Sequence, residues 1–259
     1  MLQSKVTFDS LRKVKNARVL CYPRYTTEEM DKRLQELEKL GIEVIEFTGQ
    51  KQVYNTLVLG KGHVGIVVTA YRKGEKVALK IRRVDSDRLS MEHEARMLEK
   101  ANRNGIGPRL LGITPNFLLM EYIEGALLPE WIKTLKGKDA KKRLHQVLRL
   151  ILEQAWKLDK AGLDHGELNQ APKHIIIKLD DAPCLVDFET ASDSRQTSNV
   201  TSICQYLFIG GSISNMVQRK LGKIDKGNLL NALRTYKEKR DRKSFEKILT
   251  RCGIDIFKA

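Results

Sequence analysis

A run of closely spaced glycines followed by a lysine-bearing segment, between Leu59 and Lys80, constrains this chain more than any other stretch. The run matches the pattern G-x-G-x-x-G-x-V, and the segment that follows it ends in Val-Ala-Leu-Lys. Because glycine has no Cβ atom, a glycine-rich hairpin can bring backbone N–H groups close to phosphate oxygens. The stretch therefore predicts a nucleotide-phosphate site, and its candidate binding residues are Gly60, Lys61, Gly62, Gly65, Val67, Ala78 and Lys80.

The residues after the glycines decide between two common uses of this pattern. In dinucleotide-binding proteins the glycines join a strand to a helix. Here residues 66–71 read Ile-Val-Val-Thr-Ala-Tyr, which favours a strand. The glycines are therefore expected to join two strands. The alternative without function is an ordinary glycine-rich hairpin followed by an exposed lysine.

Length and composition set broad limits on the class of protein. The 259 residues suffice for two small lobes or one large domain, and an apolar fraction of 41% with 31% charged residues is typical of a globular protein. No run of about eighteen apolar residues is present, so no membrane span is expected. The amino terminus lacks the apolar segment of a secretory signal, and the four cysteines form no C-x-x-C pair. A cytoplasmic protein with buried thiols is expected.

Basic residues are unevenly distributed along the chain. The net charge is +15, and residues 196–259 alone carry 13 basic and 5 acidic side chains. A surplus of this kind is typical of proteins that bind RNA or another acidic partner. A lysine-rich solvated surface is the alternative.

Residues 1–50 predict a small strand-helix-strand extension. Residues 17–24 are expected to form the first strand, and residues 42–47 alternate as the second. Between them, Thr26 and Glu29 form a capping box for an amphipathic helix. No catalytic pattern is present, so the extension is expected to serve packing or partner docking.

A further helix is expected after Lys80, from a cap at residues 85–87 to Asn102. It carries two acidic candidates, Glu92 and Glu94. Only Glu94 shares a helix face with the apolar residues that must point toward the sheet. Glu94 is therefore predicted to pair with Lys80, and the alternative is a surface glutamate.

Two short strands, residues 108–113 and 117–123, follow this helix. The second is expected to lead into a connector between two lobes, where Met120 and the backbone groups of Glu121 to Ile123 bind the edge of an adenine. Beyond it, apolar residues at helical spacing predict a long buried helix over residues 144–158.

A second stretch with candidate catalytic and metal-binding residues runs from Leu163 to Glu189. Two short apolar strands within it are expected to form a hairpin that places Asp187 beside the loop containing His165 and Glu167. Glu167 is then positioned to receive a hydroxyl proton. Asp187 is positioned to hold Mg²⁺, which prefers oxygen ligands.

Taken in order, these motifs resemble those of protein-kinase-like proteins of the small, atypical kind. The chain is similar to the RIO kinases and to the kinase of the KEOPS tRNA-modification complex, and most similar to a group of predicted archaeal serine/threonine kinases. The resemblance implies that the glycine hairpin covers the phosphates of ATP and that Lys80 contacts them, with Glu94 as its ion-pair partner. It implies further that residues 121–123 form the adenine-binding hinge, that His165 belongs to the catalytic loop, and that Asp187 binds Mg²⁺.

The chain departs from the family pattern in three places. The catalytic aspartate is replaced by Glu167, whose side chain is one methylene longer. Pro172 stands where the metal-binding asparagine is expected, which leaves His174 or Asn169 as the second metal ligand. Glu189 replaces the glycine that ordinarily follows the Asp-Phe pair.

The resemblance covers residues 50–210 and implies an α+β, bilobal protein-kinase-like fold. Behind the extension of residues 1–50, an N-terminal lobe of mainly antiparallel strands is expected over residues 51–123 and a reduced helical C-terminal lobe over residues 124–259. No A-P-E motif and no long activation segment are present. The helical tail is expected to expose a basic face formed by Lys237, Lys239, Arg240, Arg242, Lys243, Lys247 and Arg251.

The function expected from the resemblance is phosphotransfer that depends on ATP and Mg²⁺, to a serine or threonine of a protein substrate or of the chain itself. The alternative is an ATP-binding or ATPase switch that acts on RNA or a ribonucleoprotein through the basic tail. A third alternative is a kinase of a small molecule, since sugar and antibiotic kinases share the H-G-D type of loop.

Overall fold

The computed structural model describes residues 5–254 and divides the chain into two compact units. The first unit contains the residues up to Glu99 together with Pro108–Tyr122. The second contains Lys100–Gly107 and the residues from Ile123 onward. The architecture is α+β, as predicted, with an antiparallel sheet in the N-terminal part and a mainly helical C-terminal part.

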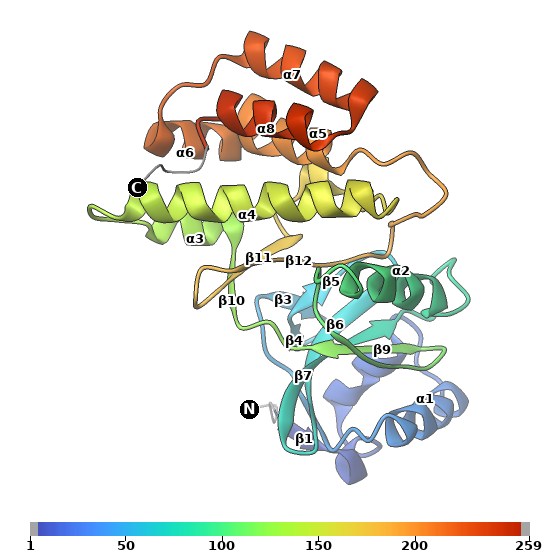
Figure 1. Ribbon diagram of the computed structural model, residues 1–259. Helices are drawn as coiled ribbons and strands as arrows, with labels where there is room; N and C mark the ends of the chain where they lie inside the picture. Colours follow the sequence, from blue (N-terminus) through green and yellow to red (C-terminus); the bar gives the residue numbers. More distant parts are fainter. Residues whose placement is uncertain (1–4, 255–259) are drawn as a thin grey trace. The chain divides into compact units, whose positions relative to one another are not determined.

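The first unit is built on a seven-stranded antiparallel sheet (Figure 1). Its strand order is β1-β2-β6-β7-β9-β8, and β5 pairs with β6. The strands are β1 (Lys5–Thr7), β2 (Val44–Glu46), β5 (Gly60–Lys61), β6 (Gly65–Arg72), β7 (Glu75–Arg82), β8 (Leu110–Ile113) and β9 (Phe117–Glu121). A separate hairpin joins β3 (Lys51–Val53) to β4 (Thr56–Val58), and the helices are η1 (Phe8–Ser10), η2 (Lys15–Cys21), α1 (Thr27–Lys39) and α2 (Glu92–Asn102).

Helix α1 covers one face of this sheet. Its hydroxyl cap is the predicted one, because Thr26 Oγ1 accepts a hydrogen bond from the Glu29 N–H at 3.1 Å. The apolar stripe of the helix joins the alternate side chains of β6 and β7 in one buried cluster. Residues 5–46 of the predicted extension are therefore part of the same sheet and core, since β2 pairs with β6 and β1 pairs with β2.

The predicted strand over residues 17–24 is wrong, because Lys15–Cys21 form the 3₁₀ helix η2. The position beside β2 is taken by β1, in which Val6 lies opposite Ile45. Ala17, Val19 and Cys21 alternate as a strand would, but Leu20 between them is also fully buried. A short apolar run does not distinguish a strand from a buried helical turn.

The predicted start of α2 at residues 85–87 is also wrong, since the helix begins at Glu92. Asp85 instead binds the Arg83 guanidinium through both oxygens, at 2.8 and 2.7 Å. Ser86 Oγ accepts a hydrogen bond from the Arg88 N–H at 3.1 Å and so closes a turn. Side chains that cap helices also form turns of this kind. The predicted end at Asn102 is confirmed.

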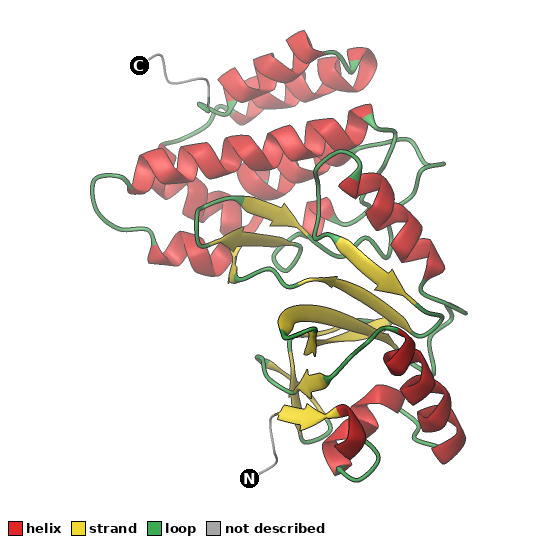
Figure 2. Ribbon diagram, turned by 60° about the horizontal axis from the view of Figure 1, so that its bottom comes forward, coloured by secondary structure: helices red, strands yellow, loops and turns green. Residues whose placement is uncertain are grey.

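The second unit is mainly helical, with one small sheet (Figure 2). That sheet has the order β10-β11-β12 and consists of β10 (Gly125–Leu127), β11 (Ile175–Lys178) and β12 (Pro183–Leu185). The helices are α3 (Leu128–Thr134), α4 (Ala140–Lys160), η3 (Leu168–Gln170), α5 (Asn199–Cys204), the π-helical turn η4 (Gln205–Ile209), α6 (Gly211–Leu221), α7 (Lys226–Lys239) and α8 (Arg242–Arg251). Helix α4 is the predicted long helix, and its apolar stripe is fully buried.

Two further expectations concern the whole chain. All four cysteines are buried thiols, as predicted. Within residues 5–254, no helix combines the length and apolar character that a membrane crossing requires.

Candidate functional site

The glycine hairpin and Lys80 lie together in the first unit because β5, β6 and β7 are neighbours in the sheet. Gly60 lies opposite Val67, and Val67 lies opposite Lys80. The turn between β5 and β6 is closed by a hydrogen bond from the Gly62 N–H to the Gly65 carbonyl at 2.8 Å. The prediction that the glycines join two strands is confirmed.

Gly65 brings the hairpin backbone directly onto the stem of Lys80. A Cβ atom at this position would lie 3.1 Å from Lys80 Cγ and Cε and 3.0 Å from the Ile81 carbonyl oxygen. Such distances are shorter than ordinary van der Waals contact, so a side chain here would displace the lysine. The glycine therefore sets how closely the hairpin approaches the ammonium-bearing side chain.

Four of the candidate nucleotide-binding side chains share one face of the sheet, and Lys61 does not, because it lies opposite Ile66 and its ammonium is 4.8 Å from the centre of the Tyr22 ring. Directly opposed residues of antiparallel strands lie on the same face, as do residues two apart along a strand. Val67 lies opposite Lys80, and Ala78 lies opposite Met120. Val67, Ala78 and Met120 are partly exposed, whereas Leu79 between them is buried in the core on the other face. The face that carries Lys80 is therefore not part of the buried core.

Lys80 is held by the predicted ion pair with Glu94. Its Nζ atom lies 2.9 Å from Oε1 and 2.8 Å from Oε2 of Glu94. Both residues are buried, with 4% and 5% of their surface exposed, whereas Glu92 is exposed. Buried charges are retained only when they are well paired, so this contact fixes the ammonium at the sheet face.

The predicted hinge begins at the last residue of β9. The Glu121 N–H donates a hydrogen bond to the Arg109 carbonyl at 2.9 Å, and the Glu121 carboxylate accepts one from the Arg109 N–H at 3.2 Å. The Glu121 N–H is therefore already used within the first unit. Tyr122 is the last residue of this unit, and Ile123 belongs to the second.

In the second unit, the hairpin of β11 and β12 places Asp187 next to His174. Ile175 lies opposite Leu185, and the Val186 N–H donates a hydrogen bond to the His174 carbonyl at 2.9 Å. Asp187 follows directly and has φ +71°, a left-handed conformation that is uncommon for residues other than glycine. The strand register thus brings together residues that precede β11 and follow β12.

Glu167, His174 and Asp187 form a compact cluster of ligand atoms. His174 Nε2 lies 3.0 Å from Glu167 Oε2 and 3.8 Å from Asp187 Oδ2. The imidazole is buried, while the two carboxylates keep 35% and 34% of their side-chain surface exposed. One atom from each residue lies within 4.8 Å of the other two. The cluster therefore combines a buried nitrogen ligand with two solvent-accessible oxygen ligands.

The loop that carries Glu167 is anchored by His165. Burial, and after it the neighbouring His174 ring, lowers the pKa of His165 to about 4, so its imidazole is neutral near pH 7. Its Nε2 lies 3.2 Å from the Val186 carbonyl oxygen, which only an N–H can bond. The Phe188 ring packs at 4.9 Å from the His165 ring. These contacts tie the loop to the segment that contains Asp187.

The two candidates for the second metal ligand differ in position. Asn169 lies on the 3₁₀ turn η3 with its side chain exposed, whereas His174 is buried beside both carboxylates. His174 is therefore the better candidate.

Sequence reasoning missed Asn199, Asp164 and Arg195, which support this loop. Asn199 Oδ1 accepts a hydrogen bond from the His165 N–H, and Asp164 binds Arg195 at 2.7 Å. These partners are 34 and 31 positions apart along the chain, and no motif relates them.

No protein-family model matches this chain. A curated protein of Methanocaldococcus jannaschii, named "Uncharacterized protein MJ1211", is 32% identical to it over 102 residues. The match covers 83% of that protein and 39% of this chain. Over these residues the chain belongs to the MJ1211 family. The name of MJ1211 states no activity, so the geometry described above is the basis for assigning a function.

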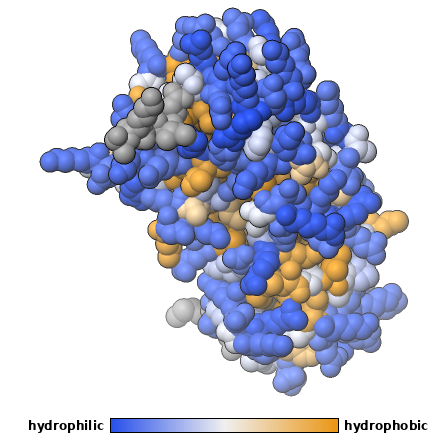
Figure 3. Space-filling model, viewed as in Figure 1, coloured by the Kyte–Doolittle hydropathy of each residue, from blue (hydrophilic) through white to orange (hydrophobic). Residues whose placement is uncertain are grey.

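The basic C-terminal face of this MJ1211-family chain is smaller than predicted. Arg240 binds Thr197 Oγ1 at 2.6 Å and the Thr197 carbonyl at 2.8 Å, and Arg242 binds both oxygens of Glu153 at 2.7 and 2.8 Å. Both arginines are half-buried, since their planar groups are used in packing. Hydrophilic residues dominate the side of α7 and α8 seen in Figure 3, and the members of the predicted basic face that are exposed are Lys237, Lys239, Lys243, Lys247 and Arg251.

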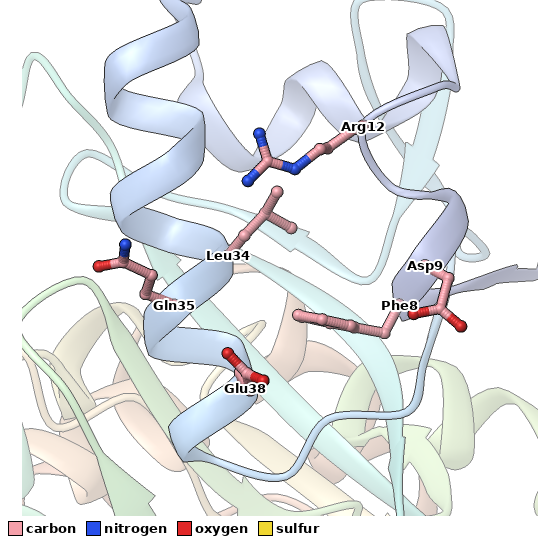
Figure 4. Close-up of a pocket in the computed structure, with 6 residues that line it drawn as sticks. All are labelled: Phe8, Asp9, Arg12, Leu34, Gln35 and Glu38. Atoms are coloured by element: carbon pink, nitrogen blue, oxygen red, sulfur yellow. The ribbon is translucent and has the colours of Figure 1, made fainter.

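A pocket of about 270 Å³ in the first unit contains none of the predicted site residues. It lies between α1 and the segment that follows β1, and Phe8 and Leu34 point into the space between them (Figure 4). Arg12 at its rim forms an ion pair with Asp31. Its lining residues are Phe8, Asp9, Arg12, Leu34, Gln35 and Glu38.

Proposed function

We propose that this protein is an ATP-dependent phosphotransferase with a protein-kinase-like fold, which phosphorylates a serine or threonine hydroxyl of a protein or of itself. The observation that carries the proposal is the Lys80–Glu94 pair beneath the glycine hairpin. Gly65 packs on the Lys80 stem, and Glu94 holds the ammonium at 2.8 Å. A glycine hairpin over a paired lysine is suited to bind the phosphates of a nucleoside triphosphate.

The carboxylates of the second unit supply the remaining chemistry. In the proposed reaction the acceptor oxygen forms a bond to the γ-phosphorus, the bond from that phosphorus to the β,γ-bridging oxygen breaks, and ADP leaves. Glu167 takes the proton of the acceptor hydroxyl, since its carboxylate is partly exposed and its loop is held in place by His165. The proposal requires residues of both units to contact the same nucleotide.

The residues fit a triphosphate better than they fit Mg²⁺. Lys80 and the glycine backbone provide the cation and the N–H groups that phosphate oxygens bind. The oxygens of Glu167 and Asp187 suit Mg²⁺, but the buried imidazole of His174 is a nitrogen ligand, which Mg²⁺ does not favour. A divalent cation bound there would neutralise charge on the phosphates.

Labelled ATP tests this function. The full chain, incubated with γ-labelled ATP and either Mg²⁺ or Mn²⁺, should release ADP and transfer label to protein. Lys80→Ala and Asp187→Asn should each lose about a hundredfold or more in rate, because phosphoryl transfer depends on positioned charge. Lys32→Ala is the matched control, since Lys32 is an exposed lysine on α1. Absence of any turnover, or variants as active as the parent chain, would contradict the proposal.

A second candidate function is an ATP-dependent switch that acts on RNA. The observation that favours it is the spacing of Lys243, Lys247 and Arg251 on α8, which are four residues apart and all exposed. That spacing places three positive charges on one side of the helix.

The salt dependence of RNA binding tests this candidate. Binding should weaken with added salt, and replacing the three residues by glutamine should lower the slope of log affinity against log salt by about 2 to 3. Binding that is absent or independent of salt would count against this candidate.

A further inference from the structure

The cluster of Glu167, His174 and Asp187 has a composition that does not match the cation expected from the sequence. Two of its ligand atoms are carboxylate oxygens, but the most buried of the three residues is the histidine, with 2% of its side-chain surface exposed. Mg²⁺ takes oxygen ligands almost exclusively, whereas imidazole suits first-row transition metals. The nitrogen of His174 therefore indicates which metal the cluster prefers.

The spacing of the three atoms fits one ion. Two ligands that are each about 2.1 Å from a transition-metal ion lie about 3.0 Å apart at a right angle and about 4.2 Å apart on opposite sides. His174 Nε2 lies 3.0 and 3.8 Å from the two carboxylate oxygens, which is within these limits. The atoms are thus already at coordinating separations.

The position of the His174 imidazole is not explained by a simple hydrogen bond to Glu167. The distance from Nε2 to Glu167 Oε2 suits a hydrogen bond, yet Nε2 makes none of acceptable geometry within the described structure. The other ring nitrogen, Nδ1, is also buried without a hydrogen-bond partner. Leaving buried polar atoms unsatisfied costs stability. Binding of a metal by Nε2 would satisfy one of them.

We propose that Glu167, His174 and Asp187 form a binding site for a first-row transition-metal dication, and that this site binds Mn²⁺ in preference to Mg²⁺. The inference rests on the proposed function only in placing this ion beside the phosphates of a nucleotide. His174 is the selectivity residue, because it replaces an oxygen ligand by a nitrogen ligand. Glu167 and Asp187 supply the negative charge that attracts the ion, and Glu167 contributes Oε2 alone, so that its other oxygen takes the acceptor proton in the proposed reaction.

The direct test is Mn²⁺ bound to the full chain without nucleotide. Titration followed by electron paramagnetic resonance should give saturable binding, with an affinity about tenfold or more above that for Mg²⁺ in competition. Electron spin-echo measurements on the bound Mn²⁺ should show coupling to a ¹⁴N nucleus of an imidazole. This second measurement uses the parent chain, so it does not depend on whether a variant folds.

His174→Asn tests the selectivity residue. It restores an oxygen ligand and should lower Mn²⁺ affinity about tenfold or more, change Mg²⁺ affinity less than about threefold, and abolish the nitrogen coupling. His63→Asn is the control for Mn²⁺ binding by other histidines, because His63 is exposed and should leave Mn²⁺ affinity unchanged.

The outcomes separate this inference from the proposed function. Equal affinities for Mn²⁺ and Mg²⁺, or bound Mn²⁺ without nitrogen coupling, would overturn the inference even if ATP is turned over. Selective Mn²⁺ binding with nitrogen coupling would support it even if no ATP turnover were found, and the proposed function alone would then fail.

Discussion

Asn199 Oδ1 accepts a hydrogen bond from the backbone N–H of His165 at 2.8 Å, although the two residues are 34 positions apart. The Asn199 amide nitrogen also donates to the Leu163 carbonyl and to Asp159 Oδ1, both at 2.8 Å. One buried side chain at the start of α5 thus holds both ends of the Leu163–His165 segment. The loop that carries Glu167 is fixed by a residue with no motif of its own.

Replacing Asn199 by alanine should destabilise the fold by about 2–4 kcal/mol, because it leaves several buried polar groups without their partner. Urea unfolding of the full chain measures this change. Asn231→Ala is the control, because Asn231 is exposed on α7 and should change the free energy of unfolding by less than about 0.5 kcal/mol. An Asn199→Ala variant as stable as its control would show that the loop is held by other contacts.

Gly166 and Gly162 allow the cost of backbone strain to be compared with the cost of close packing. Both have positive φ, +90° and +65°, but a Cβ atom at Gly162 would meet nothing within 4 Å. At Gly166 it would lie 2.7 Å from Arg195 Nη2 and 2.9 Å from the Thr190 carbonyl oxygen. Gly162→Ala should therefore cost about 1–2 kcal/mol from conformation alone, and Gly166→Ala should cost at least about 1 kcal/mol more. Equal costs in thermal unfolding would contradict the close approach.

The hydrogen bond between Tyr236 and Asp159 should make the stability of the fold depend on pH. Burial raises the pKa of Asp159, and the hydrogen bond from the Tyr236 hydroxyl, at 2.9 Å, opposes that rise. A carboxyl group with a raised pKa in the folded state stabilises the fold below its unfolded pKa of 3.8, and this contribution is lost as pH rises through the folded pKa. Tyr236→Phe raises that pKa further, so its cost should grow from about 1 kcal/mol at pH 4 to about 2 kcal/mol at pH 7.

Tyr206→Phe is the control for this pH dependence. The Tyr206 hydroxyl is buried and makes no hydrogen bond within the described structure, so its removal should be neutral or stabilising at both pH values. Urea unfolding at pH 4 and pH 7 checks both variants. A Tyr236→Phe cost that is the same at the two pH values would show that Asp159 has the same protonation state in both.

The Lys80–Glu94 pair should contribute to stability as well as to the proposed site. Lys80→Ala removes the ammonium from a buried carboxylate and should cost about 3 kcal/mol, whereas the double variant Lys80→Met with Glu94→Leu should recover much of that loss. Lys32→Ala breaks the exposed pair with Glu28 and should cost less than about 0.5 kcal/mol. Similar costs for Lys80→Ala and Lys32→Ala in urea unfolding would contradict the burial of the pair.

Periodicity predicted the parts of the fold in which one face is buried. It identified α1 and α4, and it chose Glu94 over Glu92 because only Glu94 shares the apolar face of α2. Such choices depend on residues three or four positions apart, which a sequence displays directly.

Contacts between distant residues could not be predicted in this way. Arg33 is fully buried in α1 and donates hydrogen bonds to the carbonyls of Leu20 and Arg82 and to the Asn116 side chain. These partners are 13, 49 and 83 positions away, so no local pattern distinguishes Arg33 from a surface arginine. The same limit applies to Arg240 and Arg242, which a charge count assigns to the exposed basic face.

The candidate site could be predicted from the sequence only in part. Residue type and spacing indicated Lys80, Glu167 and Asp187 one by one. The place of His174 beside both carboxylates depended on the register of β11 and β12, in which Ile175 lies opposite Leu185. A shift of that register would move the histidine away from Asp187.

The proposed function requires Lys80 and Asp187, which belong to different units, to act on one bound nucleotide. A double-mutant cycle on ATP turnover, with the parent chain, Lys80→Ala, Asp187→Asn and the double variant, measures this most directly. Each single change should reduce the rate about a hundredfold, and the double variant should lose little more than either one, because groups that act together are not additive. Losses that multiply, or single variants with the parent's rate, would show that the two side chains do not serve the same nucleotide.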